Sequence, residues 1–99
     1  MNYSIVNSPA VKSDIIEAVD HYKRINPKLA KQFLLRIREA KKYIRQYPVG
    51  FQLKYKEVRT LLLRQFPYHI HYLIDEDRQQ IVILAIIHAY RNPKDYSVR

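Results

Sequence analysis

The end of the chain carries the side chains with the clearest capacity for chemistry. His88, Arg91 and Tyr96 lie at and just beyond the end of a long apolar run. An imidazole titrates near neutral pH, so His88 can be a general base, a general acid or a phosphate donor. The alternative is a structural histidine at a strand end, bonded through a ring nitrogen to a backbone carbonyl. Tyr90 and Tyr96 can stack a base or supply a hydroxyl, although Tyr96 can equally pack the tail against the domain.

Cations in the middle of the chain form a second group of candidates. Lys54 and Lys56 precede a β-prone segment that contains Arg59. Apolar residues follow Arg59, so we expect its stem to be partly buried and its guanidinium to be held in place for bidentate phosphate binding. An ion pair with Asp14 or Glu17 is an equally physical alternative. The sequence leaves both uses of Arg59 open.

Two histidines two residues apart, His69 and His71, are expected on one face of a strand. That spacing can hold a metal, but no third ligand is apparent and the chain has no cysteine. We therefore expect cross-strand packing and hydrogen bonding at these histidines, with neither a metal nor a cofactor. Arg64 is expected to be solvated.

A single domain must position these side chains. The chain has 99 residues and 47% apolar content, which suits one core and one domain spanning residues 1–99. Every residue from Ile81 to Ile87 is apolar, which favours a strand covered on both sides and makes 80–90 the best candidate for a central strand. Because Pro93 lacks an N–H, the strand ladder should stop near Tyr90.

Two cap-and-proline signals, Ser8-Pro9 and Asn26-Pro27, predict two helices in close succession. The second helix should end near Tyr47, because Pro48 follows. Helices joined this tightly form an antiparallel hairpin. Apolar residues recur every three or four positions, and Asp14 falls among the charged residues on the other side of the first helix. The apolar positions are Val11, Ile15, Ala18, Val19 and Tyr22 in the first helix and Leu29, Phe33, Ile37, Ala40 and Ile44 in the second.

A change of period beyond Gly50 predicts a sheet. Gly50 is the only glycine, so a left-handed turn from helices to sheet is expected there. Three strand-length runs follow, at 58–66, 69–74 and 80–90, and their short links indicate an antiparallel meander. With a short strand at 3–7, the prediction is an α+β fold: an N-terminal strand, a helix hairpin packed on one face of the sheet, then three strands. The opposite face should stay open and concave for a partner.

Charge is unevenly placed along the chain. Its formal charge is +9, from 18 Lys and Arg against 9 Asp and Glu. Between Asn26 and Pro48 only Glu39 opposes seven cations, which are Lys28, Lys31, Arg36, Arg38, Lys41, Lys42 and Arg45. This balance favours polyanions or an acidic protein partner. No apolar run approaches the ~20 residues of a membrane helix and residues 1–9 lack a signal core, so we expect a cytoplasmic protein without membrane contact.

The order and spacing of several short segments carry a family resemblance over nearly the whole chain. They are Ala10…Asp14-Ile15, Asn26-Pro27…Ala30…Phe33, Pro48, Val58-Arg59, Phe66-Pro67-Tyr68-His69-Ile70-His71-Tyr72 and Ile83-Leu84-Ala85-Ile86-Ile87-His88…Arg91…Pro93…Tyr96. This pattern resembles the RelE/ParE superfamily of toxins from bacterial type II toxin–antitoxin systems. The resemblance implies a toxin neutralised by an antitoxin encoded beside it, whose disordered segment folds across the toxin surface.

The resemblance also implies one of two activities. RelE-like members cleave mRNA on the ribosome without a metal, whereas ParE-like members poison DNA gyrase. Our first hypothesis is ribosome-dependent mRNA cleavage. In it the catalytic residues are His88, Arg91, Tyr96 and Arg59, and the RNA-binding residues are Lys54, Lys56, His69 and Arg64. A gyrase inhibitor is the second hypothesis, and a degenerate member that only binds its antitoxin is the third. His69 departs from the family pattern, because some RNA-cleaving relatives carry an arginine there.

Overall fold

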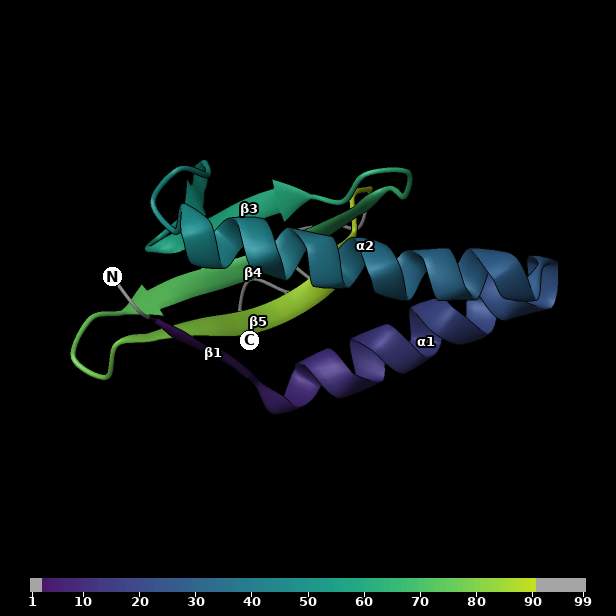
Figure 1. Cartoon of the computed structure of the whole chain (residues 1–99), viewed down its shortest axis with the longest axis horizontal. Coiled ribbons are helices and arrows are strands. Elements are labelled where there is room, and N and C mark those ends of the chain that lie inside the picture. Colours follow the sequence, from purple (N-terminus) through teal and green to yellow (C-terminus); the bar gives the residue numbers. More distant parts are fainter. Residues whose placement is uncertain (1–2, 91–99) are drawn as a thin grey trace.

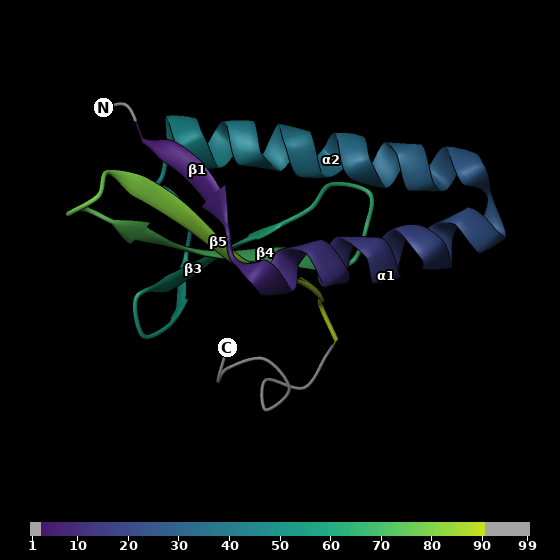
Figure 2. The same cartoon turned by 90° about the horizontal axis from the view of Figure 1, so that it is seen from below.

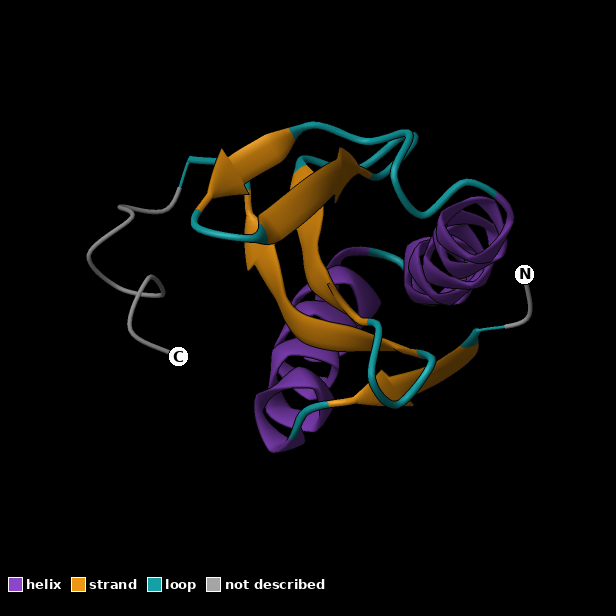
Figure 3. Ribbon diagram, turned by 90° about the vertical axis from the view of Figure 1, so that its left-hand side faces the viewer, coloured by secondary structure: helices purple, strands orange, loops and turns teal. Residues whose placement is uncertain are grey.

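The computed structural model describes residues 3–90, which form two helices and one five-stranded sheet (Figure 1). The elements are β1 (Ser4–Asn7), α1 (Pro9–Ile25), α2 (Pro27–Gln46), β2 (Leu53–Tyr55), β3 (Val58–Leu62), β4 (Tyr68–Asp75) and β5 (Gln80–His88). The strand order is β1-β5-β4-β3-β2, with β1 parallel to β5 and the other pairs antiparallel. Figure 3 shows the strands curving around the two helices. The predicted α+β fold is confirmed, with β2 as an additional strand.

Both helices begin where the cap-and-proline signals predict. Asn26 caps α2 through its side chain, because Oδ1 accepts a hydrogen bond from the Lys28 N–H at 3.0 Å. Ser8 precedes α1 without capping it through its side chain, since its hydroxyl donates to the Leu84 carbonyl at 2.9 Å. α2 ends at Gln46, two residues before Pro48. No helix within residues 3–90 is both long and apolar enough to cross a membrane.

The helix hairpin buries a ring cluster against the sheet. Phe33 is fully buried, and its ring lies 5.3 Å from Phe66 and 5.5 Å from Tyr22 between centroids. The buried residues of α2 are Ala30, Phe33, Ile37, Ala40 and Ile44. The predicted stripe of α2 is therefore confirmed except at Leu29, which is half-buried while Ala30 takes the buried place.

Asp14 is buried, which corrects its assignment to the charged side of α1. β1 pairs with β5 only as far as Ile83, so the following backbone groups on that edge of β5 need other partners. Ser8 donates to the Leu84 carbonyl, and Asp14 Oδ2 accepts the Ile86 N–H at 3.0 Å. The start of α1 thus continues the pairing that β1 leaves unfinished.

β5 lies inside the sheet between β1 and β4, whereas the middle strand is β4. Its pairing passes from Tyr72↔Ile83 to His71↔Ala85, so Leu84 is an extra residue, a β-bulge. The bulge shifts the alternation of side chains by one residue. Ile81, Ile83 and Ile86 therefore belong to the core under the helices, while Ala85 and Ile87 form a second small cluster with Tyr55. The strand ends at His88, two residues before the predicted limit.

The turns use left-handed backbone at positions other than the predicted one. Gly50 has no positive φ; it is needed for close approach, because a Cβ there would lie 3.2 Å from the Tyr47 carbonyl oxygen. The positive φ angles fall at Lys56 (46°), Gln65 (74°) and Gln79 (52°), one in each link between successive strands from β2 to β5. The predicted strand at 58–66 is also too long, since β3 ends at Leu62.

Candidate functional site

His88 lies exposed at the end of β5, on the side of the sheet that the helices cover. It pairs with Tyr68, whose ring meets the imidazole edge-on at 5.3 Å between centroids. Nδ1 accepts a hydrogen bond from the Tyr90 N–H at 3.3 Å, so the ring bonds to a backbone N–H and not to a carbonyl. A cavity of about 270 Å³ adjoins the ring and is lined by the carboxylates of Asp14 and Glu17. His88 therefore faces acidic groups. Two further predicted catalytic residues, Arg91 and Tyr96, lie outside the described residues.

His69 lies on the opposite side of the sheet. Neighbouring residues in a strand point to opposite faces, so His69 lies on the other face from Tyr68 and its partner His88. Burial and then the charge of Lys54 lower the pKa of His69. The predicted RNA-binding residue His69 thus lies on the far face from His88, where the charge of Lys54 acts on it.

The predicted cross-strand packing is found at His71, which is almost fully buried and packs its ring against Tyr55 of β2. The rings of His69 and His71, in the same strand, meet edge-on at 6.2 Å between centroids. Tyr55 Oη and His71 Nδ1 lie within hydrogen-bond distance at 3.2 Å. Within residues 3–90, no group of three His, Cys, Asp or Glu side chains is placed to hold a metal.

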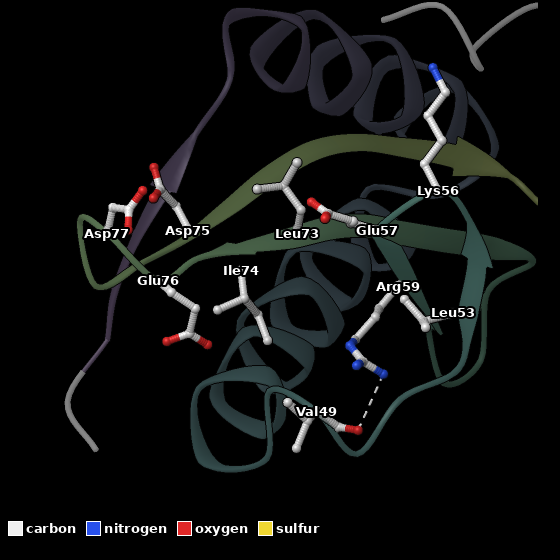
Figure 4. A pocket seen from close by; sticks show the side chains of 10 residues that line it. All are labelled: Val49, Leu53, Lys56, Glu57, Arg59, Leu73, Ile74, Asp75, Glu76 and Asp77. Carbon is white, nitrogen blue, oxygen red and sulfur yellow. Dashed lines mark hydrogen bonds between the residues drawn. The ribbon is translucent and has the colours of Figure 1, made fainter.

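Arg59 fastens the loop between α2 and β2. Its guanidinium donates to the Phe51 carbonyl at 2.8 Å and to the Val49 carbonyl at 3.3 Å (Figure 4). Of the two uses left open for Arg59, the ion pair with Asp14 or Glu17 is not formed within the described residues, where Nη1 donates to backbone carbonyls instead. Tyr72 supports the same loop: its hydroxyl donates to the Pro48 carbonyl at 2.6 Å, and burial raises the pKa of Tyr72 to about 12 against the opposing charge of Arg59.

The remaining predicted RNA-binding residues lie apart from one another. Lys56 is exposed in the turn between β2 and β3. Arg64 has a 66% exposed side chain and forms an ion pair with Glu39 of α2 at 2.8 Å. The described candidates therefore do not converge on one phosphate-sized site.

The helices diverge towards β1 (Figure 2). Side chains of both helices and of β1 line a groove of about 680 Å³ there, which sequence reasoning missed. Its apolar lining is Ile5, Ile15, Leu34 and Ile37, and its cationic lining is Arg38, Lys41, Lys42 and Arg45. Leu34 is 45% exposed. Burial lowers the pKa of Lys41, whose Nζ donates to Asn7 Oδ1 at 3.2 Å. The excess of cations in α2 was the available signal.

The face of the sheet away from the helices is closed at β5, contrary to the expectation of an open, concave surface. Ala85 is 2% exposed and Ile87 is 1% exposed, and both pack with Tyr55. Tyr55 comes from β2, the strand that the sequence did not predict. At β5 the sheet therefore offers no open apolar surface among the described residues, whereas the groove beside the helices does.

The chain shares its fold with solved structures of toxin–antitoxin systems. The chain is similar to a structure described as the chromosomal ParDE system from P. aeruginosa, with 26% identity and a TM-score of 0.75 over 87% of this chain and 95% of that one. The RelBE2 toxin–antitoxin complex from Mycobacterium tuberculosis is 16% identical with a TM-score of 0.57, over 89% of this chain and 99% of that one. The E. coli RelBE toxin–antitoxin complex is 12% identical with a TM-score of 0.55, over 90% of this chain and 99% of that one.

The family itself is given by the sequence. Residues 5–93 match the family described as the ParE toxin of the type II toxin–antitoxin system parDE. The chain therefore belongs to the ParE family of toxins. A comparison with curated protein sequences finds no match.

Proposed function

We propose that this toxin inhibits DNA gyrase, as the resemblance implies for ParE-like members, and that it does not cleave mRNA. The observation that carries the proposal is the separation of the catalytic candidate His88 from the RNA-binding candidate His69. Metal-free RNA cleavage needs a proton acceptor and cations around the same phosphate. Here His88 and His69 lie on opposite faces of the sheet.

The surroundings of the separated groups support the same proposal. The exposed carboxylate of Glu17 lines the cavity beside His88, and its negative charge disfavours a phosphate there. One nitrogen of the Arg59 guanidinium, Nη1, donates to two backbone carbonyls of the loop after α2. The match to the ParE family and the similarity to the ParDE structure agree with this direction.

Two assays on the same preparation test the proposed target. Purified gyrase with excess toxin should lose supercoiling activity, and unimpeded supercoiling would contradict the proposal. Primer extension on translating ribosomes should show no new 3′ ends on the message. New ends that disappear in His88→Ala would restore the mRNA hypothesis.

We also propose that an acidic, amphipathic antitoxin segment fills the groove between the helices and β1. ParDE and RelBE structures are described as toxin–antitoxin systems or complexes, and the groove combines an apolar lining with four cations. Such a groove fits a segment with one apolar and one acidic face. The partner for the test is the product of the neighbouring reading frame with an acidic C-terminal segment.

Two adjacent leucines of α2 provide a matched test of the groove. Leu34 lines the groove and is 45% exposed, whereas Leu35 is 56% exposed and lies outside it. Leu34→Glu should weaken antitoxin binding at least about tenfold, because it places a carboxylate against an apolar segment. Leu35→Glu should leave the affinity, measured by isothermal calorimetry, nearly unchanged. Equal losses in the two variants would place the antitoxin elsewhere.

A further inference from the structure

A second pocket, of about 570 Å³, lies on the sheet side of the loop that follows α2 (Figure 4). The loop at Val49, the start of the β2–β3 hairpin at Leu53 and the turn between β4 and β5 enclose it. None of its lining residues also lines the groove assigned to the antitoxin. The pocket is therefore a separate surface of the toxin.

The rim of this pocket is acidic although the chain carries a charge of +9. Its four carboxylates, Glu57, Asp75, Glu76 and Asp77, outnumber the two cations that also line the pocket, Lys56 and Arg59. Asp75 is 3.9 Å from Arg78, and Glu76 accepts a hydrogen bond from the Tyr3 hydroxyl. Glu57 and Asp77 form no hydrogen bond or ion pair with any residue in the described part of the chain. Two carboxylates are thus available to a partner.

The floor of the pocket is apolar and exposed. Val49 is 67% exposed and Leu53 is 51% exposed, and the half-buried Leu73 and Ile74 line the pocket from opposite faces of β4. Exposed apolar surface that adjoins a polar rim is typical of a protein interaction site. The bonds from Arg59 to two loop carbonyls hold one wall in place, so the pocket exists before any partner arrives.

We propose that this pocket receives a basic segment with apolar side chains from the protein that the toxin inhibits, a statement that rests on the proposed function. The acidic rim favours a positively charged partner even though the chain as a whole is basic. The reason is that cations farther than about 8 Å from the pocket are largely screened at physiological salt. An acidic antitoxin segment is repelled from the same rim and drawn to the cations of α2. The two pockets therefore divide the two kinds of partner by charge.

A peptide titration tests the pocket without any assumption about the target. The probe is a 15-residue peptide of lysine, leucine and alanine with its leucines on one helical face, and the control peptide carries glutamate in place of lysine. Added to the 15N-labelled full chain, the lysine peptide should shift the amide signals of Leu53, Leu73 and Asp77, and less so in high salt. Shifts confined to other surfaces, or no shifts, would overturn the proposal.

Variants connect the pocket to inhibition. Glu57→Gln with Asp77→Asn should weaken both peptide binding and gyrase inhibition at least about tenfold and leave antitoxin affinity unchanged. Asp20→Asn, an exposed carboxylate of α1 outside the pocket, is the matched control. Full inhibition by the double variant would overturn the assignment to the target. If the wild-type chain fails to inhibit gyrase, the proposed function fails, while the peptide titration still decides whether the pocket binds basic segments.

Discussion

Asp14 shows how one carboxylate can complete a sheet from outside it. It replaces a missing strand by accepting the Ile86 N–H, and Asp14→Ala would leave that donor without its partner. We expect Asp14→Ala to lower the free energy of unfolding by about 1–3 kcal/mol. Asp14→Asn, which keeps an acceptor oxygen, should cost less. Urea unfolding measures both, with the exposed Asp20→Ala as control. Equal losses in Asp14→Ala and Asp20→Ala would contradict this role.

His69 should make stability depend on pH. Its pKa is lowered in the folded state by burial and by Lys54, so the unfolded chain binds the proton more readily. The stabilising contribution is complete above the unfolded pKa of about 6.5 and is lost as pH falls through the folded pKa. Urea midpoints at several pH values should therefore decline on acidification, and His69→Gln should flatten that decline. An unchanged slope in His69→Gln would contradict this contribution.

At the scale of elements, the hairpin of β2 and β3 stores strain in its turn. Lys56 has a φ of 46°, which costs a non-glycine residue about 1–2 kcal/mol. Lys56→Gly should therefore raise the free energy of unfolding by roughly 0.5–1 kcal/mol after the entropic cost of glycine. Lys54→Gly, within β2, removes the same charge from extended backbone and should destabilise. Thermal unfolding of the two variants should move in opposite directions, and a parallel shift would refute the strain.

Element types could largely be read from the sequence, whereas their register could not. Proline and cap residues predicted the starts of both helices, and the apolar run predicted β5. β2 escaped notice because Leu53–Tyr55 is only three residues long. The bulge at Leu84 decides which side chains of β5 enter the core. It could not be predicted, because every residue around it is apolar and the sequence shows no alternation to interrupt.

The arrangement of the candidate site residues could not be predicted for the same reason. Residue types picked out His88 and His69 as titratable groups near one end of the sheet. Only the pairing of Tyr68 with His88 shows that the two rings lie on opposite faces. The burial of Asp14 was missed because the helix pattern assigns buried positions by hydrophobicity alone. Its carboxylate is buried because it accepts a hydrogen bond from the Ile86 N–H.

At the scale of the whole molecule, charge is divided between a basic helix groove and an acidic sheet pocket. Long-range attraction mainly accelerates association, so the antitoxin association rate constant should fall about tenfold between 50 and 500 mM NaCl. Lys42→Gln with Arg45→Gln should reduce that salt dependence. Lys31→Gln, outside the groove, should alter it less. Stopped-flow fluorescence measures these rates, and a rate independent of salt would contradict electrostatic steering.

β1 and β5 are neighbours in the sheet, although they lie near opposite ends of the described residues in the sequence. Contacts this far apart in the chain form late, because the intervening loop must close before they give any stability. During synthesis, β1 and the buried carboxylate of α1 must therefore wait until Ile86 has left the ribosome. Until then the groove beside β1 lacks a fixed wall. A nascent toxin therefore completes the groove proposed for its antitoxin only when β5 is in place.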